Sequence, residues 1–198
     1  SMRHREFLPG EVAWVSGASS GIGREVAREL SGVGVRVFAS ARRVAELEAL
    51  CQETGGVTPL PLDVTDAAAV ARAVDGVDGV INLVGILAER GRQTFKSVHV
   101  DAPAAIAIAA AGAKVESFVH VSAIGAAANA PSEYSRSKAA GEAAVRGAYP
   151  DAVIMRPSVV FGPEDGFFNL FAGLARMSPA LPLFGGGKSK AKFKTTGF

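Results

Sequence analysis

Tyr134 and Lys138 are four residues apart, and Ser122 precedes Tyr134 by twelve residues at the end of an apolar run. If residues 131–147 form a helix, the four-residue step puts the phenol and the ammonium on one face, one turn apart. A free phenol has a pKa of about 10, which a neighbouring cation lowers by stabilising the phenolate. A nearby hydroxyl steadies a substrate oxygen while the proton moves. The three residues predict proton transfer to or from a carbonyl or an alcohol; the alternative is a solvated Tyr/Lys pair on a helix surface.

A glycine-rich turn near the N-terminus points to a nucleotide. Residues 11–16 are typical of a buried strand, and Gly17, Gly21 and Gly23 follow before a helical pattern over 24–30. Strand, glycine turn and helix form the context that a dinucleotide fingerprint requires. The three glycines allow the tight turn, the approach to a pyrophosphate and close helix packing. The first-turn N–H groups then face the phosphates. The spacing is G-x-x-x-G-x-G and not G-x-G-x-x-G, and a turn without a ligand is the alternative.

These two motifs together resemble the short-chain dehydrogenase/reductase superfamily over roughly residues 11–187. The resemblance implies that Ser122, Tyr134 and Lys138 are catalytic and that Lys138 also holds the nicotinamide ribose. It implies NAD(H) or NADP(H) as the cofactor.

The resemblance divides between two branches. The glycine turn and Arg42-Arg43 resemble the classical branch. From about Asp78 onward, residues 80–87, 120–126 and 161–165 resemble atypical extended members related to the 39-kDa accessory subunit of respiratory complex I. In that subunit NADPH is largely a structural element, so the resemblance implies either an enzyme or a nucleotide-holding accessory protein.

The pattern of elements predicts an α/β fold. Near-continuous apolar strands alternate with helices, which favours a parallel sheet covered on both faces. We expect a Rossmann-type doubly wound sheet of order 3-2-1-4-5-6, with a substrate domain that is short or truncated. The predicted strands are 12–16, 35–39, 58–62, 79–84, 117–122 and 152–155, and the predicted helices are 23–31, 44–53, 67–74, 100–113 and 131–147.

The end of the second predicted strand bears on the choice of cofactor. An NAD site usually needs an acidic side chain about 20 residues beyond the glycine turn, and none occurs there. Arg42 and Arg43 instead offer planar, charged donors suited to a 2′-phosphate. We predict NADP(H), with NAD(H) as the alternative. The remaining interpretation is that the two arginines are only solvent-exposed residues at the start of the next helix and bind no cofactor.

Further cofactor contacts follow from the resemblance. Asp63-Val64 matches an adenine-binding pair, residues 82–85 partly match a family Asn-Asn-Ala-Gly segment, and residues 156–163 resemble a segment bordering nicotinamide. The predicted cofactor-binding residues are Gly17, Ser19, Ser20, Gly21, Ile22, Gly23, Arg42, Arg43, Asp63, Val64, Asn82, Val84, Gly85, Tyr134, Lys138, Arg156, Pro157, Ser158 and Val159.

Composition limits the alternatives. The chain has 198 residues, 48% of them hydrophobic, which is enough for one substantial core. A net charge of +2 gives no reason to expect broad nucleic-acid binding. No apolar run reaches the ~18 residues that span a bilayer. The single Cys51, which we expect to have no catalytic role, fits a reducing compartment, and a cytoplasmic location is expected, with any membrane association through a partner. We expect residues 1–10 to be a tag remnant and arm, 11–187 the nucleotide-binding domain, and 188–198 a basic flexible tail.

Two departures from the family weaken an enzymatic interpretation. The family's helix-four Asn is replaced at the apparent equivalent position by His99, which is either a hydrogen-bonding or proton-shuttling group or a plain polar residue at a helix start. Extended members also continue for about a hundred further residues. The apolar stretch at 161–174 is expected to pack in the core, against a partner or in a dimer contact. His120 is expected to be a satisfied groove or core residue, and no metal site is predicted.

Three functions remain open at this point. The first is an NADP(H)-dependent oxidoreductase acting on a small carbonyl or alcohol. The second is an NADPH-binding accessory protein whose partner is a respiratory complex. An epimerase or dehydratase acting on a nucleotide sugar is the weakest, because it needs a fuller substrate domain. A homo-oligomer is compatible with each.

Overall fold

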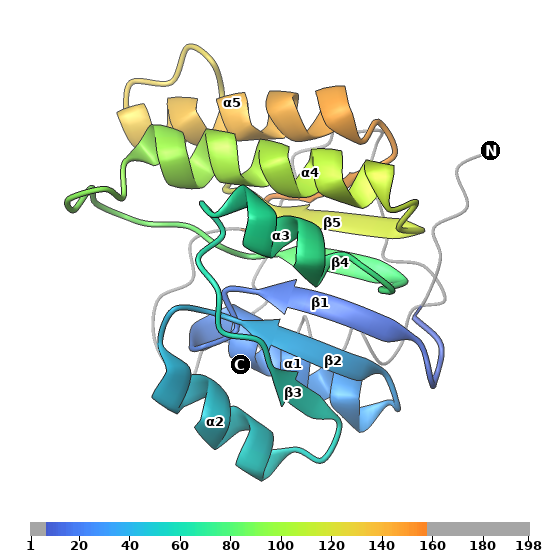
Figure 1. Cartoon of the computed structure of the whole chain (residues 1–198). Helices are drawn as coiled ribbons and strands as arrows, with labels where there is room; N and C mark the ends of the chain where they lie inside the picture. Colours follow the sequence, from blue (N-terminus) through green and yellow to red (C-terminus); the bar gives the residue numbers. More distant parts are fainter. Residues whose placement is uncertain (1–6, 158–198) are drawn as a thin grey trace, which may run out of the picture.

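The computed structural model describes residues 7–157, which fold around one six-stranded parallel sheet (Figure 1). The strand order is β3-β2-β1-β4-β5-β6, so the predicted order and fold class are confirmed. The strands are β1 Val12–Ser16, β2 Arg36–Ser40, β3 Val57–Pro59, β4 Gly79–Asn82, β5 Ser117–Val121 and β6 Val153–Met155. Predicted site residues Ser158 and Val159, the apolar stretch at 161–174 and the basic tail lie outside the described residues.

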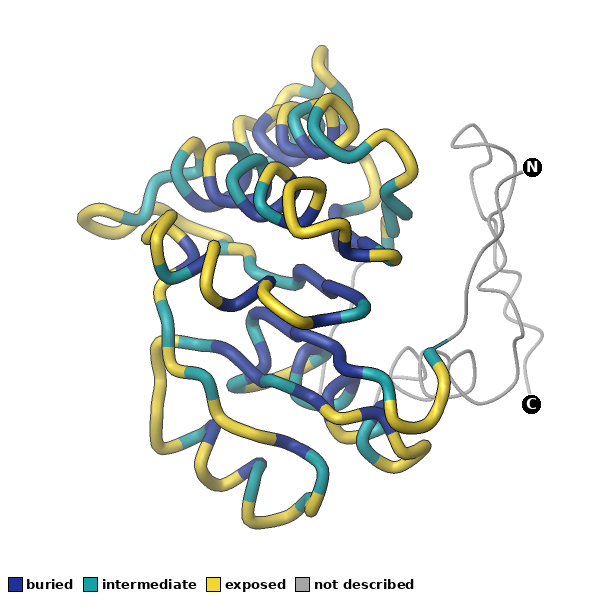
Figure 2. The backbone as a smooth tube through the Cα atoms, turned by 45° about the vertical axis from the view of Figure 1, so that its right-hand side comes forward, coloured by how far each residue is buried: buried dark blue, intermediate teal, exposed yellow. Residues whose placement is uncertain are grey.

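Helices cover both faces of the sheet because alternate strand residues point to opposite sides. Trp14 of β1 joins an apolar cluster with residues of α3, α4 and α5, and its neighbour Val15 joins a second cluster with α1 and α2 (Figure 1). Figure 2 shows the buried backbone concentrated in the strands and on the inner sides of these helices. The helices are α1 Gly21–Gly32, α2 Val44–Glu53, α3 Ala67–Ala73, the π-helical turn η1 Lys96–Asp101, α4 Ala102–Gly112 and α5 Glu133–Ala148.

The sheet register brings the carboxyl ends of the strands to one edge. Ser16 pairs with Ser40 on one side and with Asn82 on the other, and Asn82 pairs with His120. The chain order reverses between β1 and β4, which makes this the topological switch point where ligands of doubly wound folds bind. The fold therefore directs the glycine turn and the ends of β2, β4 and β5 toward a common site.

Strand β3 is shorter than the predicted 58–62. The ladder to β2 continues as single bonds, from Leu60 N to Ala39 O at 2.8 Å and from Leu62 N to Ala41 O at 3.3 Å. Pro59 and Pro61 have no N–H, and they alternate with these donors. Proline of this kind is tolerated here because β3 lies at the edge of the sheet.

The predicted helix 100–113 is divided in two. Residues 96–101 form the π-helical turn η1, and α4 begins at Ala102 with Pro103 in its first turn. A proline ring in an α-helix clashes with the carbonyl four residues earlier, which is that of His99. The wider turn accommodates this carbonyl, and turns of this kind are frequent at functional sites. Among residues 7–157, no helix is long and apolar enough to cross a membrane.

Candidate functional site

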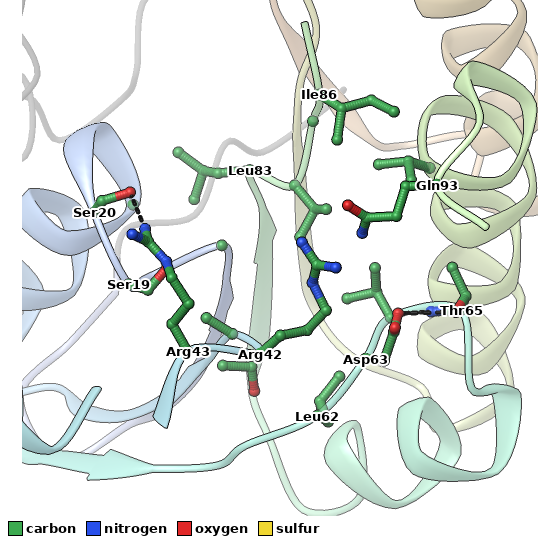
Figure 3. Close-up of a pocket in the computed structure, with 18 of the residues that line it drawn as sticks. Ser19, Ser20, Arg42, Arg43, Leu62, Asp63, Thr65, Leu83, Ile86 and Gln93 are labelled. Atoms are coloured by element: carbon green, nitrogen blue, oxygen red, sulfur yellow. Dashed lines mark hydrogen bonds between the residues drawn. The ribbon is translucent and has the colours of Figure 1, made fainter. Parts of the chain in front are cut away.

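A cavity of about 460 Å³ lies at the carboxyl edge of the sheet, between the glycine turn and the ends of β2, β3 and β4 (Figure 3). Its size is in the range of small-molecule and cofactor sites. The predicted cofactor-binding residues that line it are Gly17, Ser19, Ser20, Ile22, Gly23, Arg42, Arg43, Asp63, Val64, Val84 and Gly85. The lining also includes Leu83, which belongs to the predicted segment 82–85, and Thr65, Ile86 and Gln93, which the sequence did not single out.

The glycine turn is built for close backbone approach. Gly17 and Gly21 have φ angles of +77° and +56°, a region that side chains disfavour. A Cβ on Gly23 would lie 2.2 Å from Gly17 O, so α1 packs directly on the turn only because residue 23 has no side chain. The N-cap residue, Ser20, makes no capping bond, and the first turn of α1 has no acidic residue. The first-turn N–H groups are therefore not capped by a side chain, as a phosphate site requires.

Arg43 spans from the end of β2 to the glycine turn. Its Nη2 donates to Ser20 Oγ at 2.7 Å and to Ser19 Oγ at 3.0 Å, and its Nη1 pairs with Glu46 at 3.2 Å. Arg42 extends into the cavity, and its guanidinium is directed away from Arg43 (Figure 3). Two guanidinium groups therefore reach the cavity from adjacent positions in the chain. This arrangement suits an anion near the turn.

Asp63 forms a local turn beyond β3. Its Oδ1 accepts from Thr65 N at 3.0 Å and from Thr65 Oγ1 at 2.8 Å. These bonds fix the loop that presents residues 62–65 to the cavity (Figure 3). The adenine pair predicted from the resemblance, Asp63-Val64, is on this wall.

Lys138 is buried on α5 with its ammonium close to the cavity wall. Nζ donates to Val121 O at 3.0 Å, and a Cβ on Gly85 would lie 3.7 Å from Nζ. Burial lowers the pKa of Lys138 to about 8, although the carboxylate of Glu142 opposes that shift. A cation in this environment keeps its charge at neutral pH while having lost most of its solvation. It is well suited to act on a neighbouring anion or hydroxyl.

Ser122 directly follows β5 and is 5% exposed. Within the part of the chain that the structure describes, its Oγ has no hydrogen-bond partner. A buried hydroxyl in that condition costs free energy, so it calls for a partner that a ligand can supply. Ser122, Tyr134 and Lys138 do not contribute to the cavity lining itself; Lys138 reaches it through Gly85 and Val121, which do.

Tyr134 lies in the first turn of α5 among other rings. Its ring meets His99 edge-on at a centroid distance of 5.3 Å and Phe95 at 6.0 Å. Burial raises the pKa of Tyr134. This differs from the lowering expected of a neighbouring cation. The physical reason is that burial disfavours the charged phenolate, while the ammonium of Lys138 donates to Val121 O.

His99 is buried, and both of its ring nitrogens are hydrogen-bonded. Nε2 accepts from Ile86 N at 3.0 Å, and Nδ1 contacts Ser137 Oγ at 2.9 Å. It is therefore a hydrogen-bonding group within the site and not a plain polar residue at a helix start. Sequence reasoning missed Ser137 and Gly141, which complete this contact. Their only signal was small side chains one turn from Tyr134 and Lys138 on the helix.

Asn82 and His120 lie side by side near the carboxyl ends of β4 and β5, and their side chains are hydrogen-bonded. Asn82 Oδ1 accepts from Ser16 Oγ at 2.7 Å, and its Nδ2 donates to His120 Nδ1 at 3.1 Å. Asn82 is fully buried and does not line the cavity, so it holds neighbouring strands together. His120 was expected to be satisfied, yet its buried Nε2 lacks a hydrogen-bond partner among the residues described.

Arg156 follows β6 and forms a bidentate pair with Glu142 of α5, at 2.8 and 2.5 Å. Pro157 O accepts from Ile124 N at 3.1 Å. Neither residue lines the cavity. Gly21 is also absent from the lining, although it lies within the turn. Over residues 7–157 there is no cluster of His, Cys, Asp and Glu that could hold a metal ion.

The residues present fit a dinucleotide. The uncapped start of α1 and the guanidinium groups of Arg42 and Arg43, which reach the cavity separately, suit phosphates. Next to Val121, which lines the cavity, the buried Oγ of Ser122 has no hydrogen-bond partner among the described residues. The donors are on one side of the switch point and the predicted catalytic residues are on the other, as an extended two-part ligand requires.

Comparison with known proteins agrees with the geometry. A family model described as NAD(P)H-binding matches residues 17–166. The mouse mitochondrial NADH dehydrogenase 1 alpha subcomplex subunit 9 is 39% identical over 183 residues, which cover 90% of this chain and 48% of that protein. A ceramide reductase of Caulobacter vibrioides is 34% identical over 87% of this chain and 53% of its own length. The chain thus spans about half the length of these curated relatives.

A structural relative supports the fold. A metagenomic short-chain oxidoreductase solved with NADP has a TM-score of 0.66 and 24% identity, covering 87% of this chain and 93% of that one. A 102-residue region is also 41% identical to human dehydrogenase/reductase SDR family member 7, covering 48% of this chain and 30% of that protein. Fold, cavity and sequence similarity agree: this chain belongs to the NAD(P)H-binding family, and it is similar to short-chain dehydrogenases/reductases.

Proposed function

We propose that this protein is an NADP(H)-dependent oxidoreductase that acts on a carbonyl/alcohol pair. The observation that carries the proposal is the position of Lys138: a buried ammonium beside the Gly85 wall of the cavity, on the same helix face as Tyr134. Burying the charge of a lysine costs free energy, and Val121 O and the carboxylate of Glu142 offset part of that cost. A ribose hydroxyl or a developing phenolate would offset more of it.

The cofactor would be held from one end of the cavity to the other. The first turn of α1 and the glycine turn would hold the pyrophosphate, Asp63-Val64 would border the adenine, and Arg42 with Arg43 would bind a ribose 2′-phosphate. Residues near β4, Val84 and Gly85, would border the nicotinamide half. Bound NADP(H) supplies or accepts a hydride at the nicotinamide ring.

The chain's own residues would handle the proton. Tyr134 Oη donates a proton to the substrate oxygen in reduction and accepts it in oxidation, and Ser122 Oγ orients that oxygen. Lys138 favours the ionised phenol once its ammonium turns from Val121 O toward the tyrosine.

A second function is favoured by the relatives. The mouse protein at 39% identity is named as a subunit of NADH dehydrogenase, so an accessory protein that keeps NADPH without turnover is the competing proposal. Its partner would be a respiratory complex, and any membrane association would come through that partner. Both proposals require nucleotide binding, so binding alone does not separate them.

A turnover assay separates the two. The protein is incubated with NADPH and a panel of aldehydes, ketones, quinones and ceramides, the last because one relative is named ceramide reductase. Cofactor absorbance is followed. We expect turnover that falls about 10²–10⁴-fold in Tyr134→Phe, with NADPH affinity kept. Tight NADPH binding without turnover, unaffected by the substitution, would favour the accessory protein instead.

A further inference from the structure

His99 connects three segments that meet beside Tyr134. Its Nε2 accepts from the backbone N–H of Ile86, on the loop after β4. Its Nδ1 contacts Ser137 Oγ, which donates to Tyr134 O at 2.8 Å. The single hydroxyl hydrogen of Ser137 is used for that carbonyl, so Nδ1 must carry the hydrogen and donate to Ser137. The neutral tautomer with its hydrogen on Nδ1 satisfies all three of these hydrogen bonds, so each ring nitrogen of His99 has a partner.

The ring of His99 also holds the phenol by packing. It stacks on Phe95 at a centroid distance of 5.3 Å and 26°, and it meets Tyr134 at 5.3 Å and 87°. Phe95 and Tyr134 are themselves edge to face. Offset and edge-on arrangements are the ones that aromatic pairs prefer. Since His99 is 1% exposed, its ring has little freedom to leave this position.

The backbone of His99 is equally constrained. A Cβ on Gly141 would lie 1.9 Å from His99 O, so α5 and η1 approach as closely as backbones can. On the other side, a Cβ on Gly85 would lie 3.6 Å from His99 Nε2. Residue 99 therefore sets the separation between α5, which carries Tyr134, and the cavity wall at Gly85–Ile86.

We propose that His99 is a positioning residue, which holds Tyr134 at a fixed distance from the Gly85–Ile86 wall of the cavity and carries no proton itself. The proposal rests on the proposed role of Tyr134 as acid/base. It also explains why a histidine can stand at this position: it supplies an acceptor to one segment, a donor to another and a flat face to the phenol.

The electrostatic surroundings agree with a fixed, neutral ring. Burial, followed by the charge of Lys138, lowers the pKa of His99 to about 4. His120 and Lys138 are the titratable groups that electrostatically couple to this region, and Tyr134 is the one in ring contact. At neutral pH the ring is therefore uncharged, and it has no unoccupied nitrogen with which to pass a proton on.

The chain offers a clean reporter of this arrangement. It contains two tyrosines, Tyr134 and Tyr149. Tyr149→Phe removes the second phenol, whose hydroxyl donates to Val115 O at the other end of α5. In that background, ¹³C-labelled tyrosine gives the ring signals of Tyr134 alone. The ring currents of Phe95 and His99 displace these signals from those of free tyrosine.

The test compares His99→Ala with the matched control His120→Gln, which alters the other buried histidine. Because loss of the His99 ring also removes its ring current, the position of Tyr134 is read from nuclear Overhauser contacts between the rings of Tyr134 and Phe95. We expect these contacts to be lost in His99→Ala and kept in the control. His99→Gln retains an acceptor for Ile86 N–H but loses the ring, and it carries the same expectation if the alanine variant does not fold. Ser137→Ala, which removes one hydrogen bond of the network and keeps all three rings, should weaken these contacts less.

Turnover provides the second readout. With an accepted substrate, kcat should fall on the order of 10²-fold in His99→Ala while KM for NADPH is unchanged, because a misplacement of about 1 Å has that effect. Tyr134–Phe95 contacts that persist in both His99 variants, or an unchanged kcat, would overturn the proposal. Contacts that are lost in a protein with no turnover at all would uphold the positioning of Tyr134 and refute the oxidoreductase function.

Discussion

At the scale of single residues, the proposed preference for NADP(H) over NAD(H) depends on Arg42 and Arg43. Arg43 is already oriented over the glycine turn by Ser19 and Ser20, so little side-chain freedom remains to be lost on binding. Arg42 extends into the cavity (Figure 3). A guanidinium fork so placed recognises a phosphate better than a hydroxyl.

Arg43→Ala is therefore expected to weaken NADPH binding by about 10–100-fold, the value of one or two charge-assisted hydrogen bonds. NADH binding should change little, since NADH lacks the 2′-phosphate. Fluorescence titration with both nucleotides measures the ratio. Arg28→Ala on the outer surface of α1, where Arg28 pairs with Glu25, is the control. Equal losses for both nucleotides would mean that Arg43 only shapes the turn.

Single residues also show where prediction from sequence ends. Gly17 and Gly23 were predictable because the turn they form is local in the chain and its geometry excludes side chains. The role of His99 was not, because its partners Ile86 and Ser137 come from segments that only the folded sheet brings together. The raised pKa of Tyr134 depends on burial, which spacing along a helix does not reveal.

At the scale of elements, the site contains a close contact between α5 and η1. It depends on Gly141, where a Cβ would meet His99 O at 1.9 Å, whereas a Cβ on Gly147 of the same helix would meet nothing within 4 Å. The two glycines provide a matched pair in one helix. One is constrained by packing and the other only by helix propensity.

Gly141→Ala is expected to destabilise the protein by about 1–3 kcal/mol or more, since α5 must move away from a backbone atom. Gly147→Ala should stabilise it by up to about 1 kcal/mol, because alanine favours the helix. Urea denaturation followed by circular dichroism gives both values. Similar values for the two variants would contradict the close approach of α5 to η1.

Elements were predicted well where a periodic pattern decides them and less well where proline does. The bounds of β1 and α2 were predicted as observed, since apolar periodicity and flanking turns define both. β3 ends at Pro59, although Leu60 N and Leu62 N still donate to β2, and α4 begins at Ala102 with Pro103 in its first turn. Proline has no N–H to donate and a fixed φ angle, and the apolar pattern from which each element was predicted does not show either property.

At the scale of the whole molecule, two buried histidines make stability depend on pH. Burial is the main cause that lowers the pKa of His99 to about 4 and that of His120 to about 3, and Lys138 adds to both shifts. An unfolded histidine titrates near about 6.5. Below that pH the unfolded chain binds more protons than the folded one, so the stabilisation present above about pH 6.5 is lost as the pH falls.

We expect the free energy of unfolding to fall between pH 7 and pH 4, by on the order of 3 kcal/mol per histidine at most. His120→Gln should remove about half of that dependence, while His99 continues to contribute. Urea denaturation at a series of pH values measures the slope. A slope that the substitution leaves unchanged would show that His120 takes up its proton as readily in the folded state as in the unfolded one.

The overall fold was easier to predict from the sequence than the roles of single residues or the bounds of the elements. Alternating apolar strands and helices fixed the 3-2-1-4-5-6 order, and that order fixes the switch point where the cavity lies. Which wall each predicted catalytic residue contacts was not predictable. Lys138 reaches the cavity across Gly85, a contact set by the packing of α5 against η1 and the end of β5 and not by any motif.

The most direct test of the account follows the hydride itself. The protein is given NADPH deuterated at the transferred position of the nicotinamide, with the substrate that the panel identifies, and the alcohol product is analysed by mass spectrometry. The account predicts deuterium on the product's carbinol carbon with the unmodified protein and almost none with Tyr134→Phe, which still binds NADPH. Equal deuterium transfer by both proteins, or none by a protein that binds NADPH tightly, would contradict it.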